Sequence, residues 1–111
     1  MKDIALMALL RSESIRFDDV LNFIAERYNY VPSGFRNGDQ YNTEGENQGS
    51  ARVLFLGYLN GLSEVETLTL FGEHYSAVLR HPEGTDHQNI RQFIQHGWSG
   101  VSFDRDVLSK K

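Results

Sequence analysis

The sequence predicts an all-α fold: a single compact domain of about five helices, with a long polar loop at residues 31–49 and a short extended C-terminal segment. Apolar residues recur at helical spacing through most of the chain. The two prolines, Pro32 and Pro82, both stand where a helical pattern ends. A chain of 111 residues can bury one core but not two, so residues 1–111 are expected to form one domain.

The N-terminal part of the chain is expected to form two helices. Its first residues carry a short apolar run that Arg11 ends too early for a signal peptide, so an amphipathic helix is favoured. A second helix is expected from about Asp18 to Asn29, and Pro32 then disfavours helical geometry at the preceding residue. The apolar residues that recur at helical spacing in this stretch are Phe17, Val20, Leu21, Ile24 and Tyr28.

Residues 31–49 differ in kind from the predicted helices on either side. They show neither a helical nor a strand period, and only Val31, Phe35 and Tyr41 among them are large and apolar. A loop of this length is uncommon in so small a domain and is usually functional or disordered. We therefore treat the loop as the first candidate functional segment.

The amides of this loop, Asn37, Asn42 and Asn47 above all, can both donate and accept hydrogen bonds. One interpretation is that they are presented to a ligand or a partner at the surface. The other is that they bond the loop's own backbone and hold the loop over the helices. Both interpretations stay open at the level of sequence.

Two more helices are expected after the loop. Ser50 is a suitable N-cap for the third helix, and Asn60-Gly61 is a typical helix end. Ser63 to Glu66 forms a capping box that starts a fourth helix. The apolar stripe of this helix passes through Gly72 without a change of phase, so one helix is expected to about Arg80, with a possible kink at Gly72.

The C-terminal part is expected to hold a fifth helix and an extended tail. Thr85 or Asp86 caps this helix, which runs to His96 and ends at Gly97. Residues 98–103 alternate loosely and are expected to form a short strand or an extended segment packed on the helices. Trp98 is expected to cover the fifth helix as a lid, and a role of its ring in a binding pocket is the alternative.

Composition excludes several classes of function. Fifteen Asp and Glu residues against eleven Lys and Arg residues give a net charge of −4. This sign argues against binding to nucleic acid or to an anionic membrane, since both require a positive surface. The chain has no Cys, which excludes disulfides, thiolate metal sites and a Cys nucleophile. No phosphate loop or dinucleotide fingerprint occurs, so no cofactor is expected.

The four histidines do not have the spacing of a metal site. No two of them are three or four residues apart, which is the spacing that places two ligands on one helix face. His87 and His96, on the same predicted helix, point to opposite sides. We therefore expect no metal, although histidines from separate elements could still meet in the fold.

Asp86, His87 and Arg91 form a candidate catalytic group at the start of the fifth predicted helix. The helix N-terminus favours an anionic Asp86 and a neutral His87, and Arg91 lies on the same side as His87. Such a group could bind a small anion or transfer a proton. The structural alternative is an N-cap Asp beside a half-buried His that orders the preceding turn.

The run from His81 to Arg91, which reads His-Pro-x-Gly-x-Asp-His-x-Asn-Ile-Arg, resembles the HopJ type III effector family. The segments 35–38, 42–50 and 97–100 are similar to that family too, so the resemblance covers nearly the whole chain. The resemblance implies a protein of the kind that plant-pathogenic bacteria deliver into host cells through a type III secretion system. It implies no established enzymatic activity.

The expected function is that of a noncatalytic bacterial binding module, with a recognition surface made of loop 31–49 and segment 81–98. The expected partner is an unknown protein or a small polar ligand, and the oligomeric state stays open. The alternative is a small enzyme with His87 as general base oriented by Asp86. The expected location is the cytoplasm or, by the resemblance, a host cell. Candidate binding residues are Asn37, Asn42, Asn47, His81, Asp86, His87 and Trp98.

Overall fold

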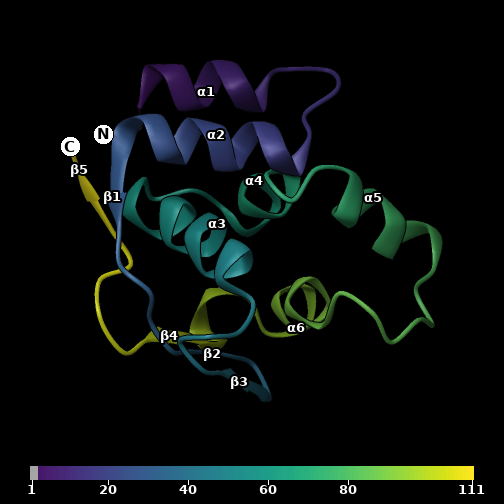
Figure 1. Ribbon diagram of the computed structural model, residues 1–111. Helices are drawn as coiled ribbons and strands as arrows, with labels where there is room; N and C mark the ends of the chain where they lie inside the picture. The colour runs from purple at the N-terminus through teal and green to yellow at the C-terminus, as the bar shows by residue number, and fades with distance from the viewer. Residues whose placement is uncertain (1–2) are drawn as a thin grey trace.

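The computed structural model describes residues 3–111, and in this part of the chain it contains six α-helices and five short strands (Figure 1). The all-α prediction is therefore wrong, and the fold is mixed α/β. The helices are α1 (Ile4–Leu10), α2 (Phe17–Arg27), α3 (Gln48–Leu59), α4 (Glu64–Thr69), α5 (Glu73–Arg80) and α6 (Gln88–His96). The strands are β1 (Tyr28–Tyr30), β2 (Phe35–Asn37), β3 (Gln40–Asn42), β4 (Val101–Phe103) and β5 (Leu108–Lys110).

The strands form two small antiparallel sheets, in the orders β1-β5 and β3-β2-β4. In the three-stranded sheet, Phe35 of β2 lies opposite Asn42 of β3 on one side and opposite Phe103 of β4 on the other. Each strand is only three residues long, which is too short for an alternating pattern to stand out from a loop. The polar loop predicted at 31–49 therefore contains a β-hairpin, and the C-terminal residues supply a partner strand to each sheet.

Helix α3 lies in the middle of the molecule, with α1 and α2 side by side above it and the three-stranded sheet below it in the view of Figure 1. Its buried residues occupy more than one face of the helix: Ala51, Val53, Leu54, Phe55, Leu56 and Gly57. Tyr58, which continues the helical spacing of Ala51, Leu54 and Phe55, is 61% exposed. A helix with neighbours on several sides is buried nearly all round, so a single stripe understates its contacts.

Several predicted helix ends differ from the structure. The N-cap of α3 is Asn47 rather than Ser50, and the N-cap of α6 is His87 rather than Thr85 or Asp86. Both caps have a left-handed backbone, with φ of 51° at Asn47 and 50° at His87. The capping box of Ser63 and Glu66 is confirmed. The predicted helix ends at Asn60 and Gly97 are confirmed as well.

The helix predicted to continue to Arg80 is in fact two helices, α4 and α5, with Gly72 between them. Gly72 has a φ of +59°, and a Cβ atom there would lie 2.7 Å from the backbone nitrogen of Phe17. The amide of Phe17 donates a 2.7 Å hydrogen bond to Oε1 of Glu73, and this bond lowers the pKa of the Glu73 carboxyl below its ordinary value. The break at Gly72 thus brings the N-terminus of α2 against the N-terminus of α5.

The replacement Gly72→Ala should destabilise the protein by more than Gly61→Ala. Both glycines have φ near +60°, which costs other residues roughly 1–2 kcal/mol, but Gly61 has open space around it while Gly72 faces backbone. Gly45→Ala, at a position with no positive φ and no neighbour within 4 Å, is the control. Urea denaturation should give the order Gly72→Ala, Gly61→Ala, Gly45→Ala from least to most stable. Equal stability of the first two variants would show that the close approach to Phe17 is unimportant.

Candidate functional site

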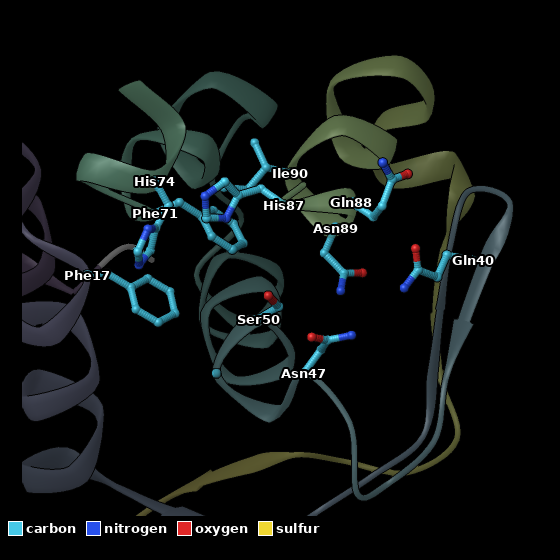
Figure 2. Close-up of a pocket in the computed structure, with 11 residues that line it drawn as sticks. Phe17, Gln40, Asn47, Ser50, Phe71, His74, His87, Gln88, Asn89 and Ile90 are labelled. Carbon is cyan, nitrogen blue, oxygen red and sulfur yellow. The ribbon is translucent and has the colours of Figure 1, made fainter. Parts of the chain in front are cut away.

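A cavity of about 390 Å³ opens where the first turns of α2, α3, α5 and α6 meet strand β3 (Figure 2). It is lined from both segments that the sequence singles out: Gln40, Asn47 and Gly49 come from loop 31–49, and His87 to Ile90 come from segment 81–98. The remaining lining residues are Phe17, Ser50, Phe71 and His74. A cavity of this size suits a small molecule.

Two imidazoles stand together in this cavity. The ring centroids of His74 and His87 are 5.0 Å apart, with an interplanar angle of 33°. His74 comes from α5 and His87 from the N-cap of α6, so the fold brings together residues that are thirteen positions apart in sequence. The ring of Phe17 contacts the edge of His74 at 5.0 Å and stacks on Phe71 at 5.9 Å, which gives this side of the cavity an aromatic wall.

Neutral polar groups form the opposite side of the cavity. Figure 2 shows Ser50 and Asn47 at the start of α3, and Gln40 on the strand facing Gln88 and Asn89. The Asn47 amide donates a 2.8 Å hydrogen bond to Oδ1 of Asn42, and Gln40 donates to the same oxygen at 3.2 Å. The cavity therefore combines amides, one hydroxyl and two imidazoles.

A buried layer of amides lies behind this polar wall and joins the hairpin to α6. Asn42 and Asn89 exchange two hydrogen bonds, of 3.2 Å from Asn42 to Asn89 and 3.1 Å in return. Asn37 donates to the backbone carbonyl of Asn89 at 2.7 Å and to its Oδ1 at 3.1 Å. Asn37 and Asn42 are almost fully buried. Of the three loop amides predicted to bind, only Asn47 lines the cavity, whereas Asn37 and Asn42 support it from behind.

The two caps with left-handed backbone, Asn47 and His87, are both cavity residues. Neither makes a side-chain capping hydrogen bond to its own helix. Helices α3 and α6 therefore both begin at the cavity, and in neither does the cap residue's side chain accept a hydrogen bond from the first turn. Non-glycine residues with a left-handed backbone often cluster at functional sites. They are strained, so they persist only where the surrounding contacts enforce that conformation.

Asp86 and Arg91 are occupied with each other rather than with the cavity. Arg91 donates from Nη2 to Oδ1 of Asp86 at 2.7 Å and from Nε to the Asp86 carbonyl at 2.6 Å. Its Nη1 donates to the carbonyl of His81 at 2.9 Å. The hydrogen bond from Arg91 lowers the pKa of the Asp86 carboxyl below its ordinary value of 3.8. Oδ2 of Asp86 lies 3.8 Å from Nε2 of His87, beyond hydrogen-bond length.

The two other predicted binding residues lie away from the cavity. His81 is exposed, and its carbonyl belongs to the turn that Arg91 holds. Trp98 packs edge-on against Phe93 of α6, as the predicted lid would, and donates from Nε1 to the carbonyl of Leu62 at 3.0 Å. Its ring also lines a second cavity, of about 410 Å³, together with Tyr58 and Phe103. The structure thus places Trp98 both on the core and at a surface hollow.

Four cavity residues, Phe17, Ser50, Phe71 and His74, lie outside the segments that the sequence predicts to bind. The sequence predicts Phe17 in a helix stripe and Ser50 as a helix cap, and the spacing of the histidines does not pair His74 with another. The available signal for His74 was the glycine two positions before it, because a helix that restarts at Gly72 places His74 in its first turn. The position of His74 in a first turn follows only once the break between α4 and α5 is known, and the sequence predicts one continuous helix there.

Within residues 3–111, no group of three or more His, Asp or Glu residues is arranged to hold a metal ion. His74 and His87 form a pair without a third such ligand. The same residues contain no helix with the length and apolar character needed to cross a membrane.

Comparison with known proteins identifies relatives. The family model described as HopJ type III effector protein matches residues 4–108, nearly the whole chain. The fold is similar to the crystal structure of VPA0580, described as a protein of unknown function, with a TM-score of 0.92 and 40% sequence identity. That match covers 100% of this chain and 97% of VPA0580. No curated protein matches the sequence significantly.

The replacement Asn89→Leu should destabilise the protein, because it removes the side-chain amide that bonds both Asn37 and Asn42 in the buried layer. The bond from Asn37 to the backbone carbonyl of residue 89 is kept. Each buried polar group left unpaired costs roughly 1–3 kcal/mol. Gln95→Leu, an exposed amide on the same helix, is the matched control and should change stability little. Urea denaturation measures both. Similar midpoints for the two variants would show that the buried amides do not tie the hairpin to α6.

The replacement Arg91→Gln should raise the pKa of Asp86, measured by NMR titration of its carboxyl carbon. A carboxyl with a lowered pKa in the folded state stabilises the fold above its ordinary pKa of 3.8, and this contribution is lost as pH falls through the folded-state value. The contribution to stability is small, because the Asp86 side chain is 69% exposed. Arg105→Gln, at a 4.0 Å ion pair with Glu44, should leave the Asp86 titration unchanged. An unchanged pKa in Arg91→Gln would exclude the assigned cause.

Proposed function

The chain belongs to the HopJ type III effector family, and we propose that it is a noncatalytic binding protein that holds a small polar ligand in the cavity beside His74 and His87. The observation that carries the proposal is that one cavity is lined from both loop 31–49 and segment 81–98. These are the two segments that sequence analysis expects to form a recognition surface. They meet because the buried amides join the hairpin to α6.

The chemistry of the cavity supports a polar ligand of modest size. Ser50, Asn47 and Gln88 offer a hydroxyl and two amides, which can match donors and acceptors on a ligand. Phe17 and Phe71 supply an apolar surface on the other side. Ligand sites typically combine apolar walls with a few polar groups that fix the orientation. A small ligand matches a hollow of this size better than a protein surface does.

The enzyme alternative, with His87 as general base oriented by Asp86, receives less support from the geometry. The shortest His87–Asp86 approach is 3.8 Å, and Asp86 is hydrogen-bonded to Arg91 instead. Three nitrogens of Arg91 donate to backbone or carboxylate acceptors in segment 81–86, so its guanidinium is committed to that turn. A base that lacks an orienting partner is poorly prepared for proton transfer.

Family membership also bears on where the protein acts. The family is described as one of type III effectors, which is consistent with secretion into host cells. Delivery into a host cell is therefore the location that the family supports, whereas the cytoplasmic location expected from the sequence stays a prediction. Binding of a small ligand is compatible with either place, because the cavity is formed by the chain itself.

The proposal predicts that a small polar metabolite will perturb the cavity. The test uses NMR of ¹⁵N-labelled protein titrated with mixtures of sugars, amino acids, organic acids and nucleotides. Shifts should concentrate at Gln40, Gly49, Ser50, His74 and Gln88. Ser50→Leu should weaken binding by about tenfold or more, because leucine fills the space beside the first turn of α3.

Ser109→Leu is the matched control, since Ser109 is exposed on β5, away from the cavity. It should leave the affinity of any bound metabolite unchanged. Shifts confined to residues outside the cavity, or equal affinities of the two variants, would contradict the proposed binding site.

A further inference from the structure

We infer that the ligand of this cavity carries an oxyanion, a phosphate, sulfate or carboxylate group, which lies against the paired imidazoles of His74 and His87. The inference rests on the proposed function and names the chemical class of its ligand. It stands on the side chains of the cavity: two imidazoles whose centroids are 5.0 Å apart, in walls that also contain hydroxyl and amide donors.

The distribution of charge around the cavity favours an anion. The chain carries fifteen Asp and Glu residues, yet none of them is among the residues that line the cavity. No Lys or Arg within residues 3–111 lines it either, so among these described residues the two histidines are the lining side chains that can carry a positive charge. Because no carboxylate lines this cavity, an anion is repelled less there than on the rest of this acidic protein's surface.

The nearest carboxylates already have partners. Asp86, 3.8 Å from Nε2 of His87, is paired with Arg91 at 2.7 Å. Glu73, which precedes His74 in α5, accepts from the amide of Phe17 and pairs with Arg16 at 3.0 Å. Each histidine therefore lies beside a carboxylate whose charge is offset by an arginine. His87 and His74 also contribute to the lowered pKa of these two carboxyls, so each carboxylate divides its charge between a histidine and an arginine. A carboxylate shared in this way neutralises a protonated imidazole only in part, which leaves positive charge for a ligand.

The groups around the imidazoles are suited to the several lone pairs of an oxyanion. Ser50 adds a hydroxyl donor, and Asn47 and Gln88 add amides; α3 and β3 contribute no charged side chain to the cavity. The first turns of α3 and α6 line the same space, and their dipoles add to the field of the imidazoles. Charge-assisted hydrogen bonds to an oxyanion are about twice as strong as neutral ones, so the imidazoles dominate.

The test titrates the labelled protein separately with inorganic phosphate, sulfate and acetate, with D-ribose as an uncharged polar probe. Sodium chloride keeps the ionic strength constant, so that general screening is excluded. The anions should produce saturable shifts at His74, His87, Ser50 and Gln88, and a preference between sulfate and acetate identifies the headgroup. Sulfate should bind more tightly at lower pH, because a protonated imidazole attracts an anion more strongly than a neutral one does, while sulfate keeps its charge.

Two conservative variants locate the anion. His74→Gln keeps a polar side chain of similar size, and His87→Asn keeps a residue that tolerates the left-handed backbone at that cap. Each should weaken sulfate binding by about tenfold and flatten its pH dependence, as expected for the loss of one charged hydrogen bond. His81→Gln, on an exposed histidine outside the cavity, is the matched control and should bind as the parent does. Unchanged spectra elsewhere show that each variant is folded.

The outcomes separate this inference from the proposed function. Anion shifts at the cavity that the two variants weaken support both. Ribose shifts at the cavity without anion shifts would overturn the oxyanion inference and leave the binding function standing. Anion shifts confined to surface residues, or affinities that survive both variants, would mean an adventitious ion only and would overturn it. If no probe perturbs the cavity, the inference is wrong, and the metabolite titration with Ser50→Leu decides the proposed function separately.

Discussion

The reciprocal pair of amide hydrogen bonds between Asn42 and Asn89 is the interaction on which the rest of the site depends. It joins the end of the β2–β3 hairpin to the first turn of α6, two segments that are 47 residues apart in the chain. Asn37 adds two more bonds to Asn89 from the other strand. A buried amide without a partner is costly, so the hairpin has one favourable position against the helix. That position places Gln40 and Asn47 opposite His87 and closes the polar side of the cavity.

The motif from His81 to Arg91 has mainly an architectural role in this fold. Arg91 holds the turn at residues 81–86 through backbone carbonyls and the Asp86 carboxylate, and Asn89 holds the hairpin. A side chain at Gly84 would collide with Arg91, 2.6 Å from its Nη2. The turn delivers His87 to the cap of α6 with a left-handed backbone, which directs its ring toward His74. The motif therefore builds one wall of the cavity, which His87 and Gln88 line.

Whether a feature of the fold can be predicted from the sequence depends on how far apart along the chain its interacting residues are. The capping box at Ser63, the helix ends at Asn60 and Gly97, and the end of α5 before Pro82 follow from contacts within a few residues, and the local sequence predicts them. The helix predicted to about Asn29 ends earlier, at Arg27, because Tyr28–Tyr30 form β1 and pair with β5. The segment 31–49, predicted to be a loop, contains the β2–β3 hairpin, which its sequence does not predict. Three-residue strands are stabilised by their partners rather than by their own period, and one partner, β4, lies more than sixty residues away. The same reasoning placed Asp86 and Arg91 in a catalytic group, although they form an ion pair beside the cavity.

By itself the sequence determined the approximate positions of the helices but not their number, the acidic and cysteine-free composition, and the two segments that meet at the cavity. It also identified the family that the comparison confirms. Only the tertiary structure decided that Asn37 and Asn42 are buried supports, that Gly72 separates two helices, and that His74 is the partner of His87. The physical reason is that burial and hydrogen-bond partners belong to pairs of residues distant in sequence. A residue's own chemistry states which bonds it can make, whereas the packing of the chain selects the ones it makes.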